Sequence, residues 1–313
     1  MATTLARLLG GLVPMLGGIP SQPEGVQGTM LASEIHMRDP FIMPYEGTYY
    51  LVGTTGDTWG TEGGGFEGYS STDLVHWTSH GPILQLDDPP TWAAYQFWAP
   101  ELYERNGRFY LCYSGKTDRT RRGTGIAVAD SPRGPFRNVS DQPLTPVEWE
   151  CLDGHLFRDG DGTDWFVFVH EWVQCEVGEM WAQRVAEDYT HLVGERHYLF
   201  RGTEAPWSNH VIDGPMMVDE GGKYHLFWSS FSARDGYCTG VATAGSVLGP
   251  YTQSAEPVIA ADGGHNCVFR GFDGRYYTSF HRPNTTPDER VVIHGLEYAD
   301  GAWRLGAPVR PLP

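Results

Sequence analysis

The sequence predicts an all-β fold, a five-bladed β-propeller, on three observations. A short apolar strand, a glycine-containing turn and an aromatic-rich strand recur as one unit five times along the chain. The units follow one another at a nearly constant interval of about 50 to 60 residues, which is typical of repeat folds. No window shows a convincing helical apolar period, so few helices are expected. Blades arranged around an axis protect their sheet edges, whereas a β-sandwich would not explain the interval.

Each of the five units is expected to start with a β-hairpin. The hairpins cover residues 38–55, 98–115, 152–170, 212–230 and 263–281, with turn glycines Gly47, Gly107, Gly162, Gly222 and Gly274. Turns such as Asp161-Gly162 readily supply the positive φ that a tight hairpin needs. Further strands at equivalent places lie in residues 68–77, 125–136 and 240–251. About four strands per unit are therefore expected, in one propeller domain over residues 34–313. Residues 1–33 form an extension that could complete a blade.

Charge and composition narrow the range of partners. The chain of 313 residues has 22 basic and 39 acidic side chains and a formal net charge of −17. Such a charge repels phosphate backbones and anionic lipid surfaces, so neither nucleic acid nor membrane is an expected partner. Residues 1–20 have one arginine, a broken apolar run and no A-x-A site, which favours a cytoplasmic over a secreted protein. The five widely spread cysteines are expected to be buried free thiols.

Polar residues stand at similar places near the start of each hairpin. Asp39, Trp98, Asp153, Asp213 and His265 each precede the turn glycine by eight or nine residues. The innermost strands of a propeller border one channel, so these side chains are expected to meet in one cavity. Crowded carboxylates cost stability through repulsion and desolvation, and they therefore indicate a functional site. Two opposed carboxylates, one acid and one base, suit inverting glycoside hydrolysis.

These residues carry a resemblance to glycoside hydrolase family 43. The motif RDPF around Asp39 resembles the family's catalytic-base motif, and FWAPEL at 97–102 resembles its second-blade motif. LDGHLFRDGDG resembles the third-blade segment, which implies that Asp153 orients the acid and modulates its pKa. GGHNCVF resembles the fifth-blade segment, which implies that a cation such as Ca²⁺ lies near His265 and is held through water. The resemblance implies a five-bladed propeller that inverts the anomeric configuration and needs no cofactor for its chemistry.

The position of the general acid departs from the family pattern. The family motif is Glu-Gly-Pro, but this chain has Asp-Gly-Pro, which begins at Asp213. TEAPW upstream resembles the acid motif of arabinan-cleaving members and supplies Glu204. Aspartate is one methylene shorter than glutamate, and a displacement of about 1 Å can cost roughly a hundredfold in rate. The sequence therefore favours Glu204 as the acid, with Asp213 holding the substrate or its partner. Asp213 as the acid is the alternative.

Five further side chains are expected to contact the sugar. Trp98 and Trp207 adjoin the proposed catalytic motifs, and a flat indole stacks well on a sugar ring. Trp59 lies in a glycine-rich loop that could form the rim of the pocket. Glu171 belongs to a His-Glu-Trp run that resembles arabinofuranosidase-like members, and His170 and Trp172 of the same run are the alternatives to it. His281, at the end of the fifth hairpin, completes the expected set.

Zinc binding through cysteine is not expected. Cys151, His155 and His170 could imitate a zinc cluster, but no C-x-x-C pair accompanies them. The predicted function is exo-acting hydrolysis of a terminal furanoside in oligosaccharide or polysaccharide side chains of plant or microbial glycans. α-L-Arabinofuranoside is the leading substrate, ahead of galactofuranoside and β-xyloside. A non-catalytic carbohydrate-binding propeller and a retaining enzyme of related families remain alternatives.

Overall fold

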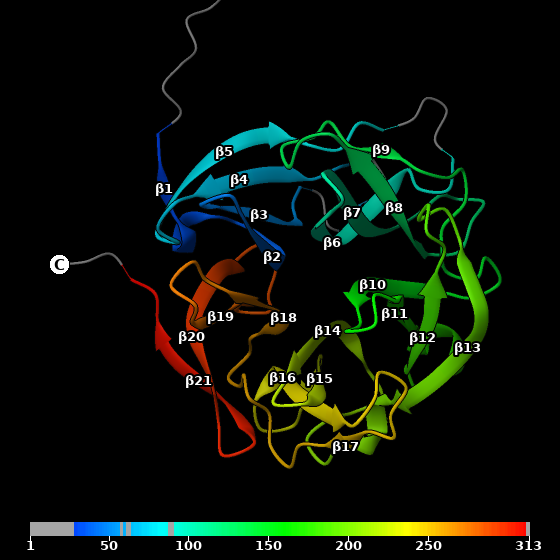
Figure 1. The fold of residues 1–313 in the computed structure, drawn as a ribbon, viewed down its shortest axis with the longest axis vertical. Coiled ribbons are helices and arrows are strands. Elements are labelled where there is room, and N and C mark those ends of the chain that lie inside the picture. The colour runs from blue at the N-terminus through cyan, green and yellow to red at the C-terminus, as the bar shows by residue number, and fades with distance from the viewer. Residues whose placement is uncertain (1–27, 57–58, 61–63, 87–90, 311–313) are drawn as a thin grey trace, which may run out of the picture.

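The computed structural model confirms the five-bladed β-propeller (Figure 1). It describes residues 28–56, 59–60, 64–86 and 91–310. Five antiparallel sheets surround a central axis, and the chain passes from one sheet to the next around the ring. In each sheet the first strand lies nearest the axis, except that β1 joins the outer edge of the first sheet. No helix in the described ranges is long and apolar enough to span a membrane.

The strands and short helices have the following bounds. Blade 1 contains β1 (Met30–Leu31), β2 (Arg38–Tyr45), β3 (Thr48–Thr54), β4 (Glu67–Ser71) and β5 (His76–Pro82). Blade 2 contains β6 (Tyr95–Arg105), β7 (Arg108–Lys116), β8 (Gly123–Ala129) and β9 (Arg137–Asn138). Blade 3 contains β10 (Cys151–Arg158), β11 (Asp164–His170), β12 (Glu179–Val185) and β13 (Leu192–Arg201). Blade 4 contains β14 (Asp213–Glu220), β15 (Lys223–Ser232), β16 (Gly236–Ala244) and β17 (Thr252–Gln253). Blade 5 contains β18 (Gly264–Arg270), β19 (Tyr276–Arg282), β20 (Arg290–Ala299) and β21 (Ala302–Pro308). The helices are η1 (Ala32–Glu34), α1 (Trp172–Cys175) and η2 (Gly202–Glu204).

The amino-terminal segment connects blade 1 to blade 5. β1 pairs antiparallel with β5 and gives blade 1 a fifth strand. Just beyond η1, His36 forms a β-bridge with Arg290 of β20, and the Val291 amide donates to the Ile35 carbonyl at 3.3 Å. These bonds join the first and last blades of the ring. Residues 1–27 of the predicted extension lie outside the described residues.

Two tryptophans fill equivalent places between strands of blades 2 and 4. Trp92, in the segment before β6, packs over Gly125 of β8, and Trp207 packs over Gly240 of β16. A Cβ atom on either glycine would lie within 2.3 Å of the indole, so no larger residue fits there. The recurrence of glycine at the start of the predicted strands 125–136 and 240–251 thus follows from the packing of these indoles.

Each innermost strand begins with a β-bulge, and one bulge residue has a left-handed backbone. These residues are Asp39, Ala99, Asp153, Gly214 and His265, with φ between 44° and 56°. The strand register shifts at the same point in all five blades. Left-handed φ costs energy for a residue other than glycine, and such strain concentrates at functional sites. The bulges therefore aim side chains of all five blades at one end of the channel.

In blades 2 and 4 the predicted residues lie one position before the left-handed residue of the bulge, so the predicted equivalence is wrong there. Asp39, Asp153 and His265 occupy the left-handed position, as the sequence repeat implies. In blade 4 that position belongs to Gly214, and Asp213 precedes it by one residue. Asp213 and Trp98 are thus equivalent to each other rather than to Asp39.

Candidate active site

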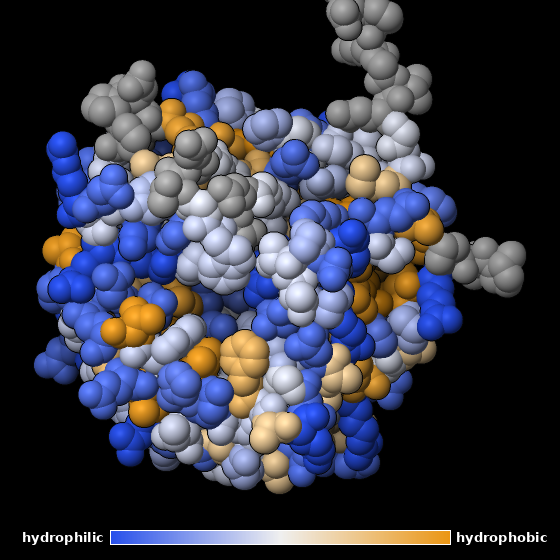
Figure 2. All heavy atoms as spheres, turned by 180° about the vertical axis from the view of Figure 1, so that it is seen from behind, coloured by the Kyte–Doolittle hydropathy of each residue, from blue (hydrophilic) through white to orange (hydrophobic). Residues whose placement is uncertain are grey.

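A cavity of about 490 Å³ lies where the innermost strands begin. Figure 2 shows the face of the molecule opposite to that of Figure 1, and this face is hollowed near its centre. The predicted site residues that line the cavity are Asp39, Trp59, Trp98, Asp153, Glu171, Asp213 and His265. The structure therefore brings together three aspartates and a histidine from four blades, as the repeat predicts.

Asp39 lines the cavity, and its neighbours favour its ionised form. The Thr54 hydroxyl at the end of β3 donates to Asp39 Oδ2 at 2.6 Å, and His265 Nδ1 lies 3.3 Å from Asp39 Oδ1. Burial would raise the pKa of Asp39, but the neighbouring His265 and Arg38 and the Thr54 hydroxyl outweigh it. The pKa of Asp39 therefore lies below its ordinary value, as a general base requires.

His281 supports Asp39 from behind and does not line the cavity. Its side chain is fully buried on β19, and its Nδ1 accepts the Asp39 backbone amide at 3.1 Å. Its Nε2 lies 3.0 Å from Asn284 Oδ1, which fixes the tautomer with the proton on Nε2. Burial lowers the pKa of His281 to about 4 and keeps the ring neutral at neutral pH. His281 is not among the described residues that line the cavity. The prediction that His281 contacts the sugar is therefore wrong.

Side chains of neighbouring blades hold four of the five bulges in place. The backbone amides and their acceptors are Asp39 N and His281 Nδ1, Ala99 N and Thr54 Oγ1, Asp153 N and Ser114 Oγ, and His265 N and Ser229 Oγ. The remaining bulge is that of Gly214 in blade 4. The residue of blade 3 that is equivalent to these acceptors is Val169, which has no polar atom in its side chain. The Gly214 amide donates instead to Asp153 Oδ2 at 3.0 Å. The Asp153 carboxylate thus fixes the backbone directly after Asp213.

Asp153 is buried and Asp213 is half-buried, and the two lie close to one another. Oxygen atoms of both carboxylates and a ring nitrogen of His265 lie within 4.8 Å of one another. Burial raises the pKa of Asp153 to about 7; the neighbouring His265 opposes the rise, and the charges of Asp213 and Asp39 add to it. Burial also raises the pKa of Asp213, with a further rise from Asp39, although the Tyr237 hydroxyl donates to Asp213 Oδ1 at 2.5 Å and opposes it. One of these carboxyls can therefore retain a proton while Asp39 is ionised.

Glu204 lies away from the cavity, which corrects the predicted preference for it as the acid. It ends η2, where its exposed carboxylate accepts the Tyr198 hydroxyl at 2.9 Å and the Arg201 amide at 3.1 Å. These bonds direct Oε1 to the start of its own helical turn. Glu204 is not among the described residues that line the cavity, whereas Asp213 is. Of the two acid candidates, Asp213 is therefore the one that lines the cavity.

Trp207 is a core residue rather than a sugar platform. Its ring packs 4.6 Å from Trp228, and its Nε1 donates to the Ser254 carbonyl at 3.2 Å. It is buried within the hydrophobic core of blades 3 and 4. The prediction that Trp207 stacks on the substrate is therefore wrong, since both its ring and its polar atom already have partners.

Trp98 and Glu171 form one wall of the cavity and are held by a common cation. The Arg122 guanidinium lies 3.6 Å from the centre of the Trp98 ring, and its Nε lies 3.3 Å from Glu171 Oε2. Its Nη2 also donates to Gln96 Oε1 at 3.0 Å. Burial raises the pKa of Glu171, while Arg122 opposes the rise. Arg122 therefore fixes an aromatic face and a carboxylate beside the aspartates.

Several residues that line the cavity were not predicted from the sequence. They are Arg38, Leu152, Val211, Phe231, Tyr237, Asn284 and Thr286. Arg38, Leu152 and Trp98 share one bulge position, so the repeat could have indicated Arg38 and Leu152. The remaining residues come from loops and outer strands whose course the repeat does not define.

The ligand atoms of Asp153, Asp213 and His265 lie close enough together to hold a cation. Asp39, Asp153 and Asp213 share the described lining of the cavity with the guanidinium of Arg38. A cation held by His265 through water would offset part of this negative charge. The resemblance implied such a cation, and its presence here remains a prediction.

Comparisons with known proteins agree with this architecture. The model of glycosyl hydrolases family 43 matches residues 33–303. A β-D-galactofuranosidase, xynD, of Aspergillus niger is 29% identical over 77% of this chain and 73% of its own length. An extracellular exo-α-(1→5)-L-arabinofuranosidase, ArbA, of Cellvibrio japonicus is 26% identical over 86% of this chain and 81% of its own. The crystal structure of an endo-arabinase from Bacteroides thetaiotaomicron is 36% identical with a TM-score of 0.80, over 88% of this chain and 99% of that one.

Proposed function

Since the chain belongs to glycosyl hydrolase family 43, we propose that it releases a terminal furanose, α-L-arabinofuranose first among the candidates, from oligosaccharide or polysaccharide side chains. As a member of this family it is a glycoside hydrolase that inverts the anomeric configuration, and its chemistry needs no cofactor. We assign the general base to Asp39, the general acid to Asp213 and the modulation of the acid's pKa to Asp153.

One observation carries the proposal: three carboxylates that line one cavity have pKa values displaced in opposite directions. The pKa of Asp39 is lowered, whereas those of Asp153 and Asp213 are raised. Protonated Asp213 can donate its proton to the glycosidic oxygen as the bond to the anomeric carbon breaks. Ionised Asp39 can take a proton from the water that attacks the opposite face of that carbon. The two proton transfers yield the inverted sugar and a free hydroxyl on the leaving group.

The rim of the cavity favours exo action. Trp59 of blade 1 donates through Nε1 to Thr286 Oγ1 of blade 5 at 3.3 Å, and its carbonyl accepts Gln96 Nε2 of blade 2 at 3.3 Å. Its ring meets Trp98 edge-on at 5.2 Å. Trp59 thus joins blades 1, 2 and 5 at the rim of the cavity. A rim joined on this side supports binding of a chain end rather than the interior of a polymer.

The similar proteins support a furanoside substrate. The named activities of the Aspergillus and Cellvibrio enzymes are galactofuranosidase and exo-arabinofuranosidase, and the Bacteroides structure is described as an endo-arabinase. All three concern five-membered sugar rings or polymers of them. Galactofuranoside and β-xyloside stay as alternatives, as does carbohydrate binding without catalysis.

Hydrolysis of nitrophenyl α-L-arabinofuranoside, β-D-galactofuranoside and β-D-xyloside tests the proposal. We expect the arabinofuranoside to have the highest kcat/KM. With linear arabino-oligosaccharides, arabinose alone should appear early, and proton NMR should show the inverted anomer first. Early release of di- or trisaccharides would contradict exo action. The absence of hydrolysis of every furanoside would favour the carbohydrate-binding alternative.

The pH profile is expected to respond in opposite directions to two substitutions beside Asp213. Activity needs Asp39 ionised and Asp213 protonated, so it falls at low pH as Asp39 gains a proton and at high pH as Asp213 loses one. Tyr237→Phe removes a bond that favours the carboxylate, raises the pKa of Asp213 and moves the alkaline limb upward by about one pH unit. Asp153→Asn removes a nearby negative charge, lowers that pKa and moves the limb downward. If the alkaline limb of the kcat/KM profile moved in the same direction for both variants, this assignment would be contradicted.

A further inference from the structure

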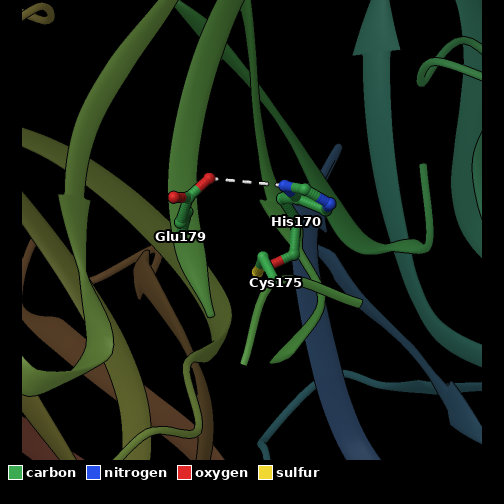
Figure 3. Close-up of side chains that lie close together, drawn as sticks. All are labelled: His170, Cys175 and Glu179. Atoms are coloured by element: carbon green, nitrogen blue, oxygen red, sulfur yellow. Dashed lines mark hydrogen bonds and ion pairs between the residues drawn. The ribbon is translucent and has the colours of Figure 1, made fainter. Parts of the chain in front are cut away.

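His170, Cys175 and Glu179 lie together on blade 3, outside the described lining of the catalytic cavity (Figure 3). His170 ends β11, Glu179 begins β12, and the two are direct partners in the antiparallel ladder. Cys175 ends α1, the helical turn that connects these strands. One nitrogen, one sulfur and one oxygen atom of the three side chains all lie within 4.8 Å of one another. We call this group the blade 3 cluster.

Hydrogen bonds fix the orientation of the His170 ring. Gln174 Nε2 donates to the Glu148 carbonyl at 3.1 Å, and Gln174 Oε1 accepts the Glu150 amide at 2.7 Å. The same Oε1 lies 3.0 Å from His170 Nε2, so this ring nitrogen must carry a hydrogen. Trp149 stacks on the ring at 4.3 Å and 11°. The other ring nitrogen, Nδ1, therefore points at Glu179, as the dashed line in Figure 3 shows.

In this arrangement two atoms with lone pairs, His170 Nδ1 and Glu179 Oε2, face each other. His170 Nδ1 lies 3.3 Å from Glu179 Oε2, and the same oxygen also accepts Trp181 Nε1 at 3.0 Å. A neutral ring whose hydrogen is on Nε2 offers Glu179 only a lone pair. A cation between the two atoms, or a second proton on the ring, would relieve this repulsion. Zn²⁺ bonds of about 2.1 Å at a tetrahedral angle place two ligand atoms roughly 3.4 Å apart, close to the separation found here.

Cys175 supplies the third donor. It is the half-buried cysteine of the chain, whereas the other four are buried. Its thiol lies 3.1 Å from the Val177 carbonyl and 3.4 Å from that of His170. We propose that the blade 3 cluster binds a Zn²⁺-class cation through His170 Nδ1, Cys175 Sγ and Glu179 Oε2, with water as the fourth ligand. Coordination releases the thiol proton to solvent and leaves a thiolate on the metal.

The surroundings resemble the outer partners of known metal sites. A metal-bound histidine typically donates its other N–H to an oxygen acceptor, as His170 does to Gln174. Glu179 is itself held by the Trp181 indole. Trp172 of α1 and the preceding Glu171 line the catalytic cavity. The cation would therefore join β11, α1 and β12 behind a wall of that cavity, and its binding does not depend on the proposed substrate.

Cobalt substitution tests the site with a signal that depends on the sulfur ligand. The full chain, stripped with a chelator and dialysed, is titrated with Co²⁺. We expect one equivalent to bind with a near-ultraviolet thiolate-to-cobalt charge-transfer band, and Zn²⁺ to displace it. Cys175→Ser should abolish the band and lower Zn²⁺ affinity by more than roughly 100-fold. Gln174→Ala should keep the band and weaken binding by roughly 10–100-fold, as expected for an outer partner.

Two controls separate loss of the site from loss of the fold. Cys238→Ala removes a buried thiol elsewhere in the chain and should keep the band. Circular dichroism and thermal melting of each variant check the propeller independently of metal. Failure of the wild-type chain to develop the band would overturn the proposal. Cobalt bound without the band would place the ion elsewhere, for example at the aspartates, and would equally overturn it.

Discussion

Asp39→Asn is expected to lower kcat by about 10²–10⁴-fold, the usual contribution of a general base, while the fold and sugar binding persist. Asparagine has the same shape as aspartate but cannot accept the proton of the attacking water. Its amide oxygen can still accept the Thr54 hydroxyl that now binds Asp39 Oδ2. Its backbone can still donate to His281. The loss should therefore appear in kcat rather than in KM.

The control for this variant is Asp130→Asn, which changes an exposed aspartate on the surface. It should match the wild-type enzyme in kcat, KM and melting temperature. Titration of product sugar, followed by tryptophan fluorescence, measures binding in both variants. Retention of most of the wild-type kcat by Asp39→Asn would eliminate Asp39 as the base. Loss of sugar binding together with kcat would instead indicate a structural role.

The fold could be predicted because its information is local and repeated. Each hairpin combines aromatic-rich strands with a glycine turn, and Gly47 and Gly107 have φ of +77° and +79° at these turns. Repetition at a constant interval then requires similar sheets around one axis. β1 could not be predicted in this way, because a two-residue strand has no alternation to detect. Its place is set by pairing with β5 and by the bridge between blades 1 and 5.

The aspartates of the site could be predicted because they belong to the repeated hairpins. The contacts made by residues in the loops could not be predicted in this way. Glu204 and Trp207 lie in the connection between β13 and β14, outside the five predicted hairpins. There, local bonds from Tyr198 and Arg201 hold Glu204 on the surface, and packing against Trp228 draws Trp207 into the core. Tyr237 was missed because it comes from the third strand of its blade, outside the hairpin. Single positions within loops depend on tertiary contacts that the sequence pattern does not specify.

Asp213→Asn and Glu204→Gln are expected to differ sharply on substrates with poor leaving groups. An arabino-oligosaccharide leaves as an alkoxide unless an acid protonates it, so loss of the acid should reduce kcat by about 10²–10⁴-fold. A nitrophenolate leaves readily without protonation, so the same variant should lose far less on the aryl furanoside. Asp213→Asn should show this pattern. Glu204→Gln should remain near the wild-type rate on both substrates, because Glu204 lies outside the described lining of the cavity.

The proposed assignment of an aspartate as the acid, where the family motif has glutamate, depends on surrounding residues that bring its carboxylate close to Asp153 and His265. The shorter side chain starts one residue before the left-handed Gly214, whose amide is bound by Asp153. The carboxylate still comes within 4.8 Å of a ligand atom of both Asp153 and His265. Asp213→Glu would therefore lengthen a side chain in a place already fitted to aspartate, and we expect it to lower kcat rather than raise it. A Glu204→Gln variant that lost activity on oligosaccharides alone, beside an active Asp213→Asn, would assign the acid to Glu204 and require η2 to move into the cavity.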